Sequence, residues 1–243
     1  MDLDERWERW RTRFSEADRD VCNLFHNRHL WVAMTQMWQD NADAIELNAI
    51  VQNWYIRLYV NTQCTGIRRE CDSDTSTSSL ENCLSELIKY PGMMNRARFE
   101  ANVEANTDIS AKFKHVNKLK FDDYAQSPSA TDLDVDRVQA DIDRLRSAAE
   151  TTRKYTNKVL AHREFPPKPI RLSWVELDGA LNAVGEVLKR YYMLWDAGII
   201  KGNLTPELPP GWERPFQTAW CTEDFVSPSA HPLDKYLPPA ANK

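Results

Sequence analysis

The stretch Arg153-Lys-Tyr-Thr-Asn-Lys-Val-Leu-Ala-His-Arg-Glu164 decides the fold, because it ends the best-specified helix of this sequence. An apolar stripe recurs every three to four residues and leads into it through Val138, Ile142, Leu145, Ala149, Thr152, Tyr155 and Val159. Aspartates follow the expected N-cap Thr131 and basic residues occupy the last turn, so both ends complement the helix dipole. We predict one helix over about 131–164, with His162 at the edge of its packed face.

The rest of the chain shows the same helical periodicity. Glycine is scarce, with 7 residues in 243, and apolar residues recur at intervals of three to four rather than alternating as in strands. The predicted fold class is therefore all-α. The expected buried faces are Leu3, Trp7, Trp10 and Phe14 in a first helix, residues 21–38 in a second, and Ile45, Ile50, Trp54, Leu58 and Ile67 in a third, longer helix.

Two capping boxes predict further helix starts. Ser78 with Glu81, and Ser173 with Glu176, have the spacing at which a hydroxyl and a carboxylate satisfy free N–H groups at a helix start. The helix after the second box carries an apolar stripe over residues 174–195 that begins at a tryptophan. We expect this helix to pair antiparallel with the helix over 131–164.

Composition indicates one helical core with an appended arm. At 243 residues, 42% of them hydrophobic, the chain is long enough for one large domain, which we assign to residues 1–200. Eight of the 13 prolines follow residue 205, so residues 201–243 are predicted to form a Pro-rich extended arm. Aromatic residues within the arm suggest that it packs on its own body or on a neighbouring subunit.

Charge and cysteine usage limit the classes of partner. A formal net charge of -5 argues against a broad basic surface, so RNA contact would have to be local and DNA is not an expected partner. Five cysteines without a Cys-x-x-Cys pair, and an N-terminus without an apolar signal region, indicate a reducing cytoplasm. No apolar run approaches the roughly 18 residues of a membrane span, so no membrane partner is expected.

No metal or cofactor is predicted from the sequence. His26 and His29 could present two imidazoles from one helix, but a third ligand is not evident. Glycine-rich phosphate loops and the usual hydrolase motifs do not occur. The basic run over residues 112–120 is typical of a solvated helix face.

The residues Thr156-Asn-Lys-Val-Leu-Ala-His162, followed by a capped helix ending in Tyr191-Tyr192, resemble the HEPN superfamily, in particular its abortive-infection (AbiU-like) branch. The stretch Tyr59-Val-Asn-Thr-Gln-Cys-Thr-Gly-Ile-Arg-Arg-Glu70 is similar to an upstream signature of that branch. The resemblance covers most of residues 20–195. It implies a helical bundle that forms a homodimer, in which two motif helices build one metal-independent RNA-cleaving site. Such proteins act in toxin–antitoxin and antiphage systems, so an antitoxin or another defence-system partner is implied.

One position departs from the family motif of an arginine, a polar residue, a few spacers and a histidine. Asn157 fits the polar position and His162 the histidine, whereas Thr156 occupies the arginine position. Cleaving RNA without a metal needs proton transfer and fixed positive charge on the transition state. His162 can transfer the proton, but Thr156 cannot supply the charge.

Other cations near the motif could supply that charge. Lys158 precedes His162 by about one turn on nearly the same face, and Arg163 follows directly. The resemblance also places the helix of Arg68 and Arg69 within the bundle. The catalytic candidates are therefore His162, Asn157 and Lys158, and the substrate-binding candidates are Arg163, Tyr155, Arg68 and Arg69.

Two hypotheses of function follow from these residues. The first is a HEPN-type endoribonuclease, which the pair of His162 and Asn157 favours. The second is a catalytically silent HEPN-fold protein that serves as a dimeric interaction or nucleotide-binding module, which Thr156 favours. A histidine in a last helical turn before prolines is also typical of a simple helix C-cap.

Overall fold

The computed structural model describes residues 2–41, 49–161, 170–197, 199, 201–205 and 207–214. Regular structure in these ranges is helical, apart from an isolated β-bridge between Asn95 and Asp132. The predicted all-α fold class is confirmed. The chain divides into two units, residues 1–206 and residues 207–243.

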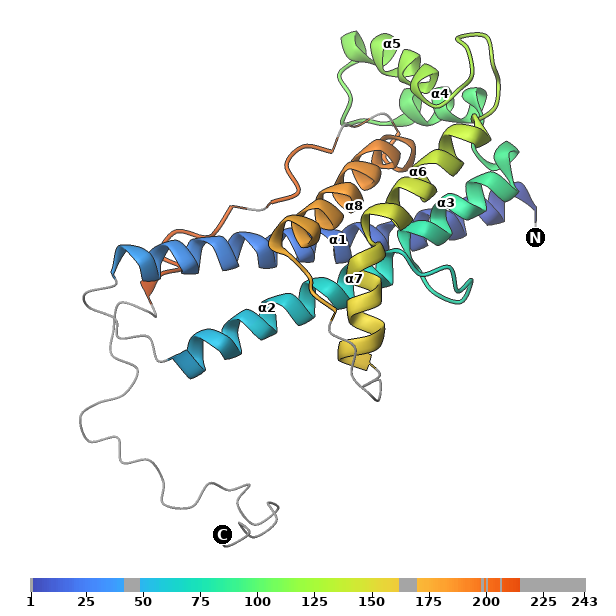
Figure 1. The fold of residues 1–243 in the computed structure, drawn as a ribbon. Helices are drawn as coiled ribbons and strands as arrows, with labels where there is room; N and C mark the ends of the chain where they lie inside the picture. The colour runs from blue at the N-terminus through green and yellow to red at the C-terminus, as the bar shows by residue number, and fades with distance from the viewer. Residues whose placement is uncertain are drawn as a thin grey trace, which may run out of the picture. The chain divides into compact units, whose positions relative to one another are not determined.

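The first unit contains the named helices, which Figure 1 labels along the chain. The α-helices are α1 (Leu3–Asp40), α2 (Ala49–Glu70), α3 (Leu80–Lys89), α4 (Arg96–Ala105), α5 (Ala111–Leu119), α6 (Val135–Ala148), α7 (Glu150–Tyr155) and α8 (Trp174–Trp195). Two 3-10 helices, η1 (Pro91–Met93) and η2 (Lys120–Asp123), and the π-helix η3 (Thr156–Ala161) connect or extend them.

Aromatic side chains of α1 form one part of the core. Trp7, Trp10 and Phe14 are buried and stack in series, with ring centroids 4.9 Å apart in each pair. The indole Nε1 of Trp10 donates a hydrogen bond of 2.8 Å to the carbonyl of Cys83 in α3. The predicted burial of these three residues is confirmed, and the indole bond holds α1 on α3.

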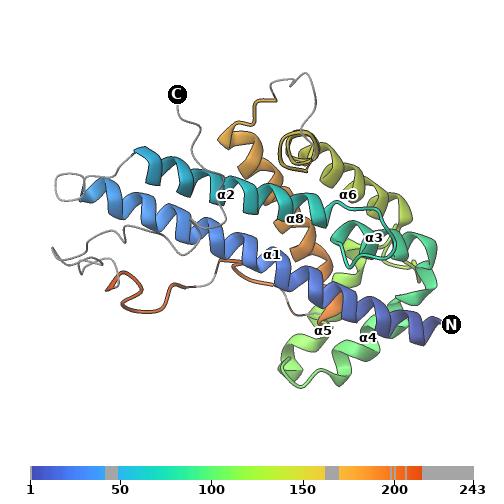
Figure 2. The same cartoon turned by 90° about the horizontal axis from the view of Figure 1, so that it is seen from below.

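Two glycines allow α2 and α8 to approach α1 at adjacent positions. A Cβ on Gly66 of α2 would lie 2.4 Å from Leu24 Cδ2, and a Cβ on Gly185 of α8 would lie 2.5 Å from Phe25 Cζ. The side-chain amide of Gln63 in α2 also donates to the Leu24 carbonyl at 2.9 Å. Helices α1 and α2 run side by side (Figure 1 and Figure 2). Three helices therefore meet at Leu24 and Phe25.

Helices α6 and α7 pair antiparallel with α8, as predicted. The residue numbers of the contacting pairs rise along α6 and α7 while they fall along α8: Asp141 contacts Arg190, Arg144 contacts Glu186, and Thr151 contacts Glu176. The buried Asp141 carboxylate accepts two hydrogen bonds of 2.8 Å from Arg190 and one of 3.0 Å from the Tyr191 hydroxyl. A buried carboxylate needs this full set of donors, so the pairing has a fixed register.

The predicted helix over 131–164 is wrong in its start and its continuity. The N-cap is Asp134, which accepts hydrogen bonds from the amides of Asp136 and Arg137, and not Thr131. The Thr131 carbonyl instead accepts a bond of 2.7 Å from the Arg96 amide, beside the β-bridge at Asp132, which keeps this segment extended. The helix is also interrupted at Ala149.

Other boundaries differ by smaller amounts. Residues 3–40 form one continuous helix where two were expected. The N-cap of α3 is Ser79 and not Ser78, and the carboxylate of Glu81 pairs with Arg146 at 2.7 Å instead of closing a capping box. The box of Ser173 with Glu176 is confirmed at the start of α8.

The second unit is described only over residues 207–214. The Trp212 amide donates to the Pro209 carbonyl at 3.1 Å, and Gly211 has a φ of +76°, which glycine adopts without steric cost. Most of the predicted Pro-rich arm lies outside the described residues. Lys201 and Leu204, at the start of that predicted arm, belong to the first unit, where Leu204 is buried and Lys201 pairs with Asp18 at 2.6 Å.

The two glycines of α8 give opposite predictions for substitution by alanine. Gly179→Ala should stabilise the protein by roughly 1 kcal/mol, because no atom lies within 4 Å of the added Cβ and alanine favours helix. Gly185→Ala should destabilise it by roughly 1–3 kcal/mol, because the Cβ would overlap Phe25. Urea unfolding of both variants measures the difference. Equal stabilisation by both would contradict the close approach of α8 to α1.

Candidate functional site

Residues 153–161, which we call the motif segment, lie on α7 and η3, against α2. The backbone passes from α-helix to π-helix after Tyr155, and both parts contact α2. In a π-helix the backbone bonds join residues five apart, and such segments occur frequently at functional sites. The segment therefore presents its side chains with a spacing that an α-helical projection does not reproduce.

Thr156, at the arginine position of the motif, points into the core. It is 4% exposed, and its hydroxyl proton is shared between the carbonyls of Thr152 at 2.9 Å and of Cys64 in α2 at 3.2 Å. A threonine hydroxyl commonly bonds the carbonyl four residues earlier, which is the one signal in the sequence for this arrangement. The position therefore fastens the motif segment to α2 and faces away from solvent.

Asn157, the next residue, is exposed and contacts Arg68 of α2. The Arg68 Nε donates a hydrogen bond of 2.7 Å to Asn157 Oδ1. The structure thus brings together two predicted site residues that are 89 positions apart in the chain. A guanidinium has five donors, so one bond to Asn157 leaves capacity to hold a phosphate.

The other predicted site residues have different surroundings. Tyr155 is half-buried and packs against the core, and Lys158 is half-buried within η3. The guanidinium of Arg69 pairs with Asp20 of α1 at 2.8 Å, so it is directed toward α1. His162 and Arg163 lie outside the described residues. Their proposed roles remain predictions.

Glu70, the last residue of α2, has a buried carboxyl group two residues after Arg68. Glu70 is 1% exposed, and its Oε2 accepts a hydrogen bond of 3.1 Å from the Leu80 amide at the start of α3. Burial raises the pKa of Glu70 to about 8, although the Leu80 amide and the Arg69 guanidinium act in the opposite direction. The carboxyl therefore holds its proton near neutral pH and joins two helices without adding a full negative charge.

Buried thiols of the site region are not nucleophiles. The four cysteines in the described residues are free thiols, and Cys64 and Cys71 lie on and just after α2. Burial raises the pKa of both thiols to about 12. Because the thiolate is the reactive form, neither group acts at neutral pH.

The described residues show neither a metal cluster nor a membrane span. Over these ranges, no group of three or more His, Cys, Asp or Glu side chains is placed to hold a metal ion. None of the helices within them combines the length and low charge that crossing a membrane requires.

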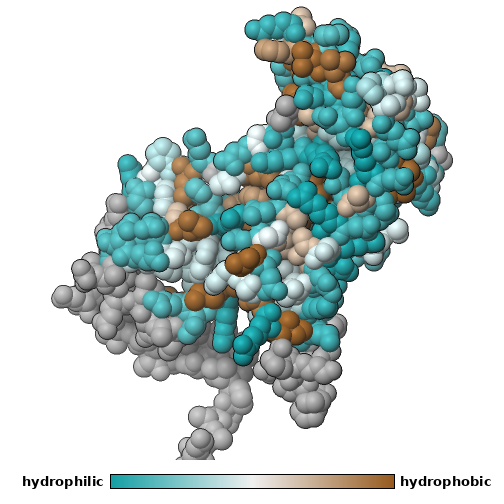
Figure 3. Space-filling view, turned by 45° about the horizontal axis from the view of Figure 1, so that its top comes forward, coloured by the Kyte–Doolittle hydropathy of each residue, from teal (hydrophilic) through white to brown (hydrophobic). Residues whose placement is uncertain are grey.

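An aromatic cluster lies between α1, α2 and the start of α8. Trp31 stacks on Tyr55 and Tyr59 at 4.7 Å between ring centroids and on Trp174 at 5.7 Å. The predicted burial of Trp54, Leu58 and Trp174 is wrong, since they are 60%, 44% and 49% exposed. Val175 and Val159 are exposed as well. Figure 3 shows that the face it draws also carries separate apolar patches among hydrophilic surface.

Comparison with known proteins identifies the family. The family model described as AbiU2 (HEPN_AbiU2) matches residues 65–208, which include both Arg68 and the motif segment. The chain is therefore an abortive-infection-related HEPN protein, and the predicted superfamily is confirmed. Within that superfamily it belongs to the AbiU2 family. No curated protein and no solved structure matched the chain.

Restoring the arginine of the family motif should harm this protein. Thr156→Arg would place a guanidinium among the buried atoms of α2 and α7 and should destabilise the fold by roughly 3–5 kcal/mol. The matched control Thr156→Val keeps the shape and should cost only about 1 kcal/mol. Chemical denaturation measures both. A Thr156→Arg variant as stable as the wild type would show that this side chain can reach solvent.

Glu70 should make stability depend on pH. The folded state keeps the proton up to about pH 8, whereas the unfolded chain releases it above about 4.5, so stability should fall as pH rises between these values. The slope from this group is on the order of 1.4 kcal/mol per pH unit. Glu70→Gln keeps the acceptor for the Leu80 amide and should remove this slope. Unfolding free energies of both proteins across that window provide the measurement, and parallel curves would contradict the raised pKa.

Proposed function

We propose that this protein is a metal-independent endoribonuclease of a defence system, with a site built from the motif segment and α2. The observation that carries the proposal is the hydrogen bond between Arg68 and Asn157. In this proposal the Arg68 guanidinium, held beside Asn157 by that bond, supplies from α2 the positive charge that Thr156 lacks. The family membership supports the defence role.

The roles of the residues follow from the chemistry of the reaction. The 2′-oxygen of the RNA attacks phosphorus, its proton passes to a base, and the bond to the 5′-oxygen breaks as that oxygen takes up a proton. His162 is the proton-transfer group. Asn157 orients the phosphate, and Arg68, with Lys158 and Arg163, stabilises the charge that develops on its oxygens.

We further propose that two copies of the chain build the site. A single motif offers one histidine, whereas the reaction needs one group to take a proton and another to donate one. Exposed apolar side chains support a protein–protein interface in this region: Val159 lies in η3, and Trp174 and Val175 lie at the start of α8, which contacts α7. An antitoxin or another defence partner would control the assembled enzyme.

A second candidate function is a catalytically silent HEPN-fold module for dimeric interaction or nucleotide binding. The observation in its favour is that the hydroxyl of Thr156 is used inside the core, so the arginine position has a structural role. Fold alone does not separate the two functions, because active and silent proteins can share a bundle.

Cleavage of RNA in the presence of EDTA tests the proposal. Wild-type protein should produce defined fragments from total RNA, and His162→Ala should produce none. Arg68→Gln should slow cleavage by roughly 10²–10³-fold, because one preorganised stabiliser of the transition state is lost. The matched control Arg57→Gln removes an exposed arginine of the same helix, about 16 Å away along its axis, and should cleave normally.

Two results would overturn the assignment. Intact RNA with a folded, dimeric wild-type protein and its defence partner removed would favour the silent module. Equal activities of Arg68→Gln and Arg57→Gln would show that Arg68 does not provide the missing charge.

A further inference from the structure

A second polar site lies in the N-terminal part of α1, between α1, the loop over residues 72–79 and α3. It is a cavity of about 260 Å³ whose lining includes Arg6, Arg9, Arg13, Glu86, Lys89 and Tyr90. All of these residues belong to the first unit, and none of them is a candidate residue of the motif site. The proposed function makes no use of this cavity.

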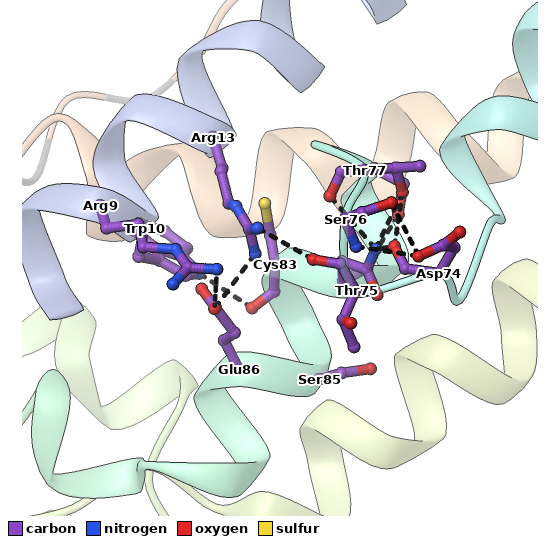
Figure 4. A network of polar contacts seen from close by, with 12 residues as sticks. Arg9, Trp10, Arg13, Asp74, Thr75, Ser76, Thr77, Cys83, Ser85 and Glu86 are labelled. Carbon is purple, nitrogen blue, oxygen red and sulfur yellow. Dashed lines mark hydrogen bonds and ion pairs between the residues drawn. The ribbon is translucent and has the colours of Figure 1, made fainter. Parts of the chain in front are cut away.

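The three arginines occupy one face of α1. Their spacing of three and four residues places them in a row along the helix, so their guanidinium groups are directed to the same cavity. Figure 4 shows Arg9 and Arg13 converging on Glu86 of α3. The acidic side chain thus holds two arginines at one place.

Arg13 lines the cavity with a side chain that two hydrogen bonds hold in place. Its side chain is 15% exposed, with Nη1 3.1 Å from the Glu86 carboxylate and Nη2 2.9 Å from the Thr75 carbonyl. These bonds join α1 to α3 and to the loop over residues 72–79. Arg13 is therefore preorganised by the fold itself.

Arg9 and Arg6 are held less tightly than Arg13. Arg9 is 46% exposed and lies 3.8 Å from Glu86, beyond hydrogen-bond distance, and the Arg6 guanidinium lies over the Tyr90 ring at 3.7 Å. With Lys89, four cations share the cavity with one carboxylate. The lining of the cavity thus carries more positive than negative charge, in a chain whose formal net charge is -5, and this local excess favours an anionic ligand.

We propose that this cavity binds a phosphomonoester. A terminal phosphate carries close to two negative charges at neutral pH and three acceptor oxygens, which match several converging guanidinium groups better than the single charge of a backbone phosphodiester. The volume suits a phosphate with part of the group that carries it, below the size of typical drug-like ligand sites. The phosphate belongs either to a free mononucleotide or to the 5′ end of an RNA, and the inference does not depend on RNA cleavage.

Binding measurements with paired probes test this proposal. The probes are AMP against adenosine, and a 2′-O-methyl RNA oligonucleotide with a 5′-phosphate against the same strand with a 5′-hydroxyl, which the protein cannot cleave through a 2′-oxygen. The phosphorylated member of at least one pair should bind roughly tenfold or more tightly, as expected for charge-assisted hydrogen bonds. Binding by AMP would identify a free ligand, and binding by the oligonucleotide alone would identify an RNA end.

Substitutions of cavity residues test whether binding depends on this cavity and not on the general charge of the protein. Arg9→Gln should lose most of the preference for the phosphorylated probe, and Lys89→Gln should weaken it. The matched control Arg19→Gln removes an arginine of the same helix that is 70% exposed and pairs only loosely with Asp20 at 3.8 Å. It should bind as the wild type does. Thermal unfolding of each variant confirms that the fold is kept.

The outcomes are decisive in both directions. Absence of binding by either phosphorylated probe, equal affinity for the members of each pair, or equal loss in Arg9→Gln and Arg19→Gln would overturn the phosphomonoester site. Failure of RNA cleavage by the wild type would leave this result unaffected, since no cleavable bond is present in the probes.

Discussion

The close contact of α2 and α8 with α1 at Leu24 and Phe25 is the constraint on which the rest of the first unit depends. At each approach the neighbouring helix has a glycine, and a Cβ at that position would require the Leu24 or Phe25 side chain to shift. Helix α2 placed in this way becomes the surface on which α7 and η3 pack. The position of the motif segment is therefore set by packing at α1, far from the motif in sequence.

The Thr156 hydroxyl transmits this placement to the site. Its bond to the Cys64 carbonyl fixes the motif segment along α2, and the next residue then meets Arg68. Position 156, where the family motif has an arginine, carries a threonine with a structural role in this chain. Under the proposed function, Arg68 of the neighbouring helix α2 supplies the positive charge that the chemistry requires.

Much of the fold could be predicted from residue patterns, because helix formation and local capping are local properties. The box of Ser173 with Glu176 and the antiparallel pairing of α6 with α8 were predicted in this way. Periodicity shows that a helix has an apolar side, but it does not show which partner covers it, so Trp54 and Leu58 were wrongly expected to be buried. The cap at Thr131 failed because a long-range bond from Arg96 holds that residue extended. The meeting of Arg68 with Asn157 is a tertiary contact that no local pattern contains.

The π-helix η3 changes how the length of the motif is counted. Its backbone bonds join residues five apart where an α-helix joins residues four apart, so one turn takes up an additional residue. The motif of this chain therefore holds one residue more per turn after Tyr155 than an α-helix would, while Thr156 is buried and Asn157 is exposed.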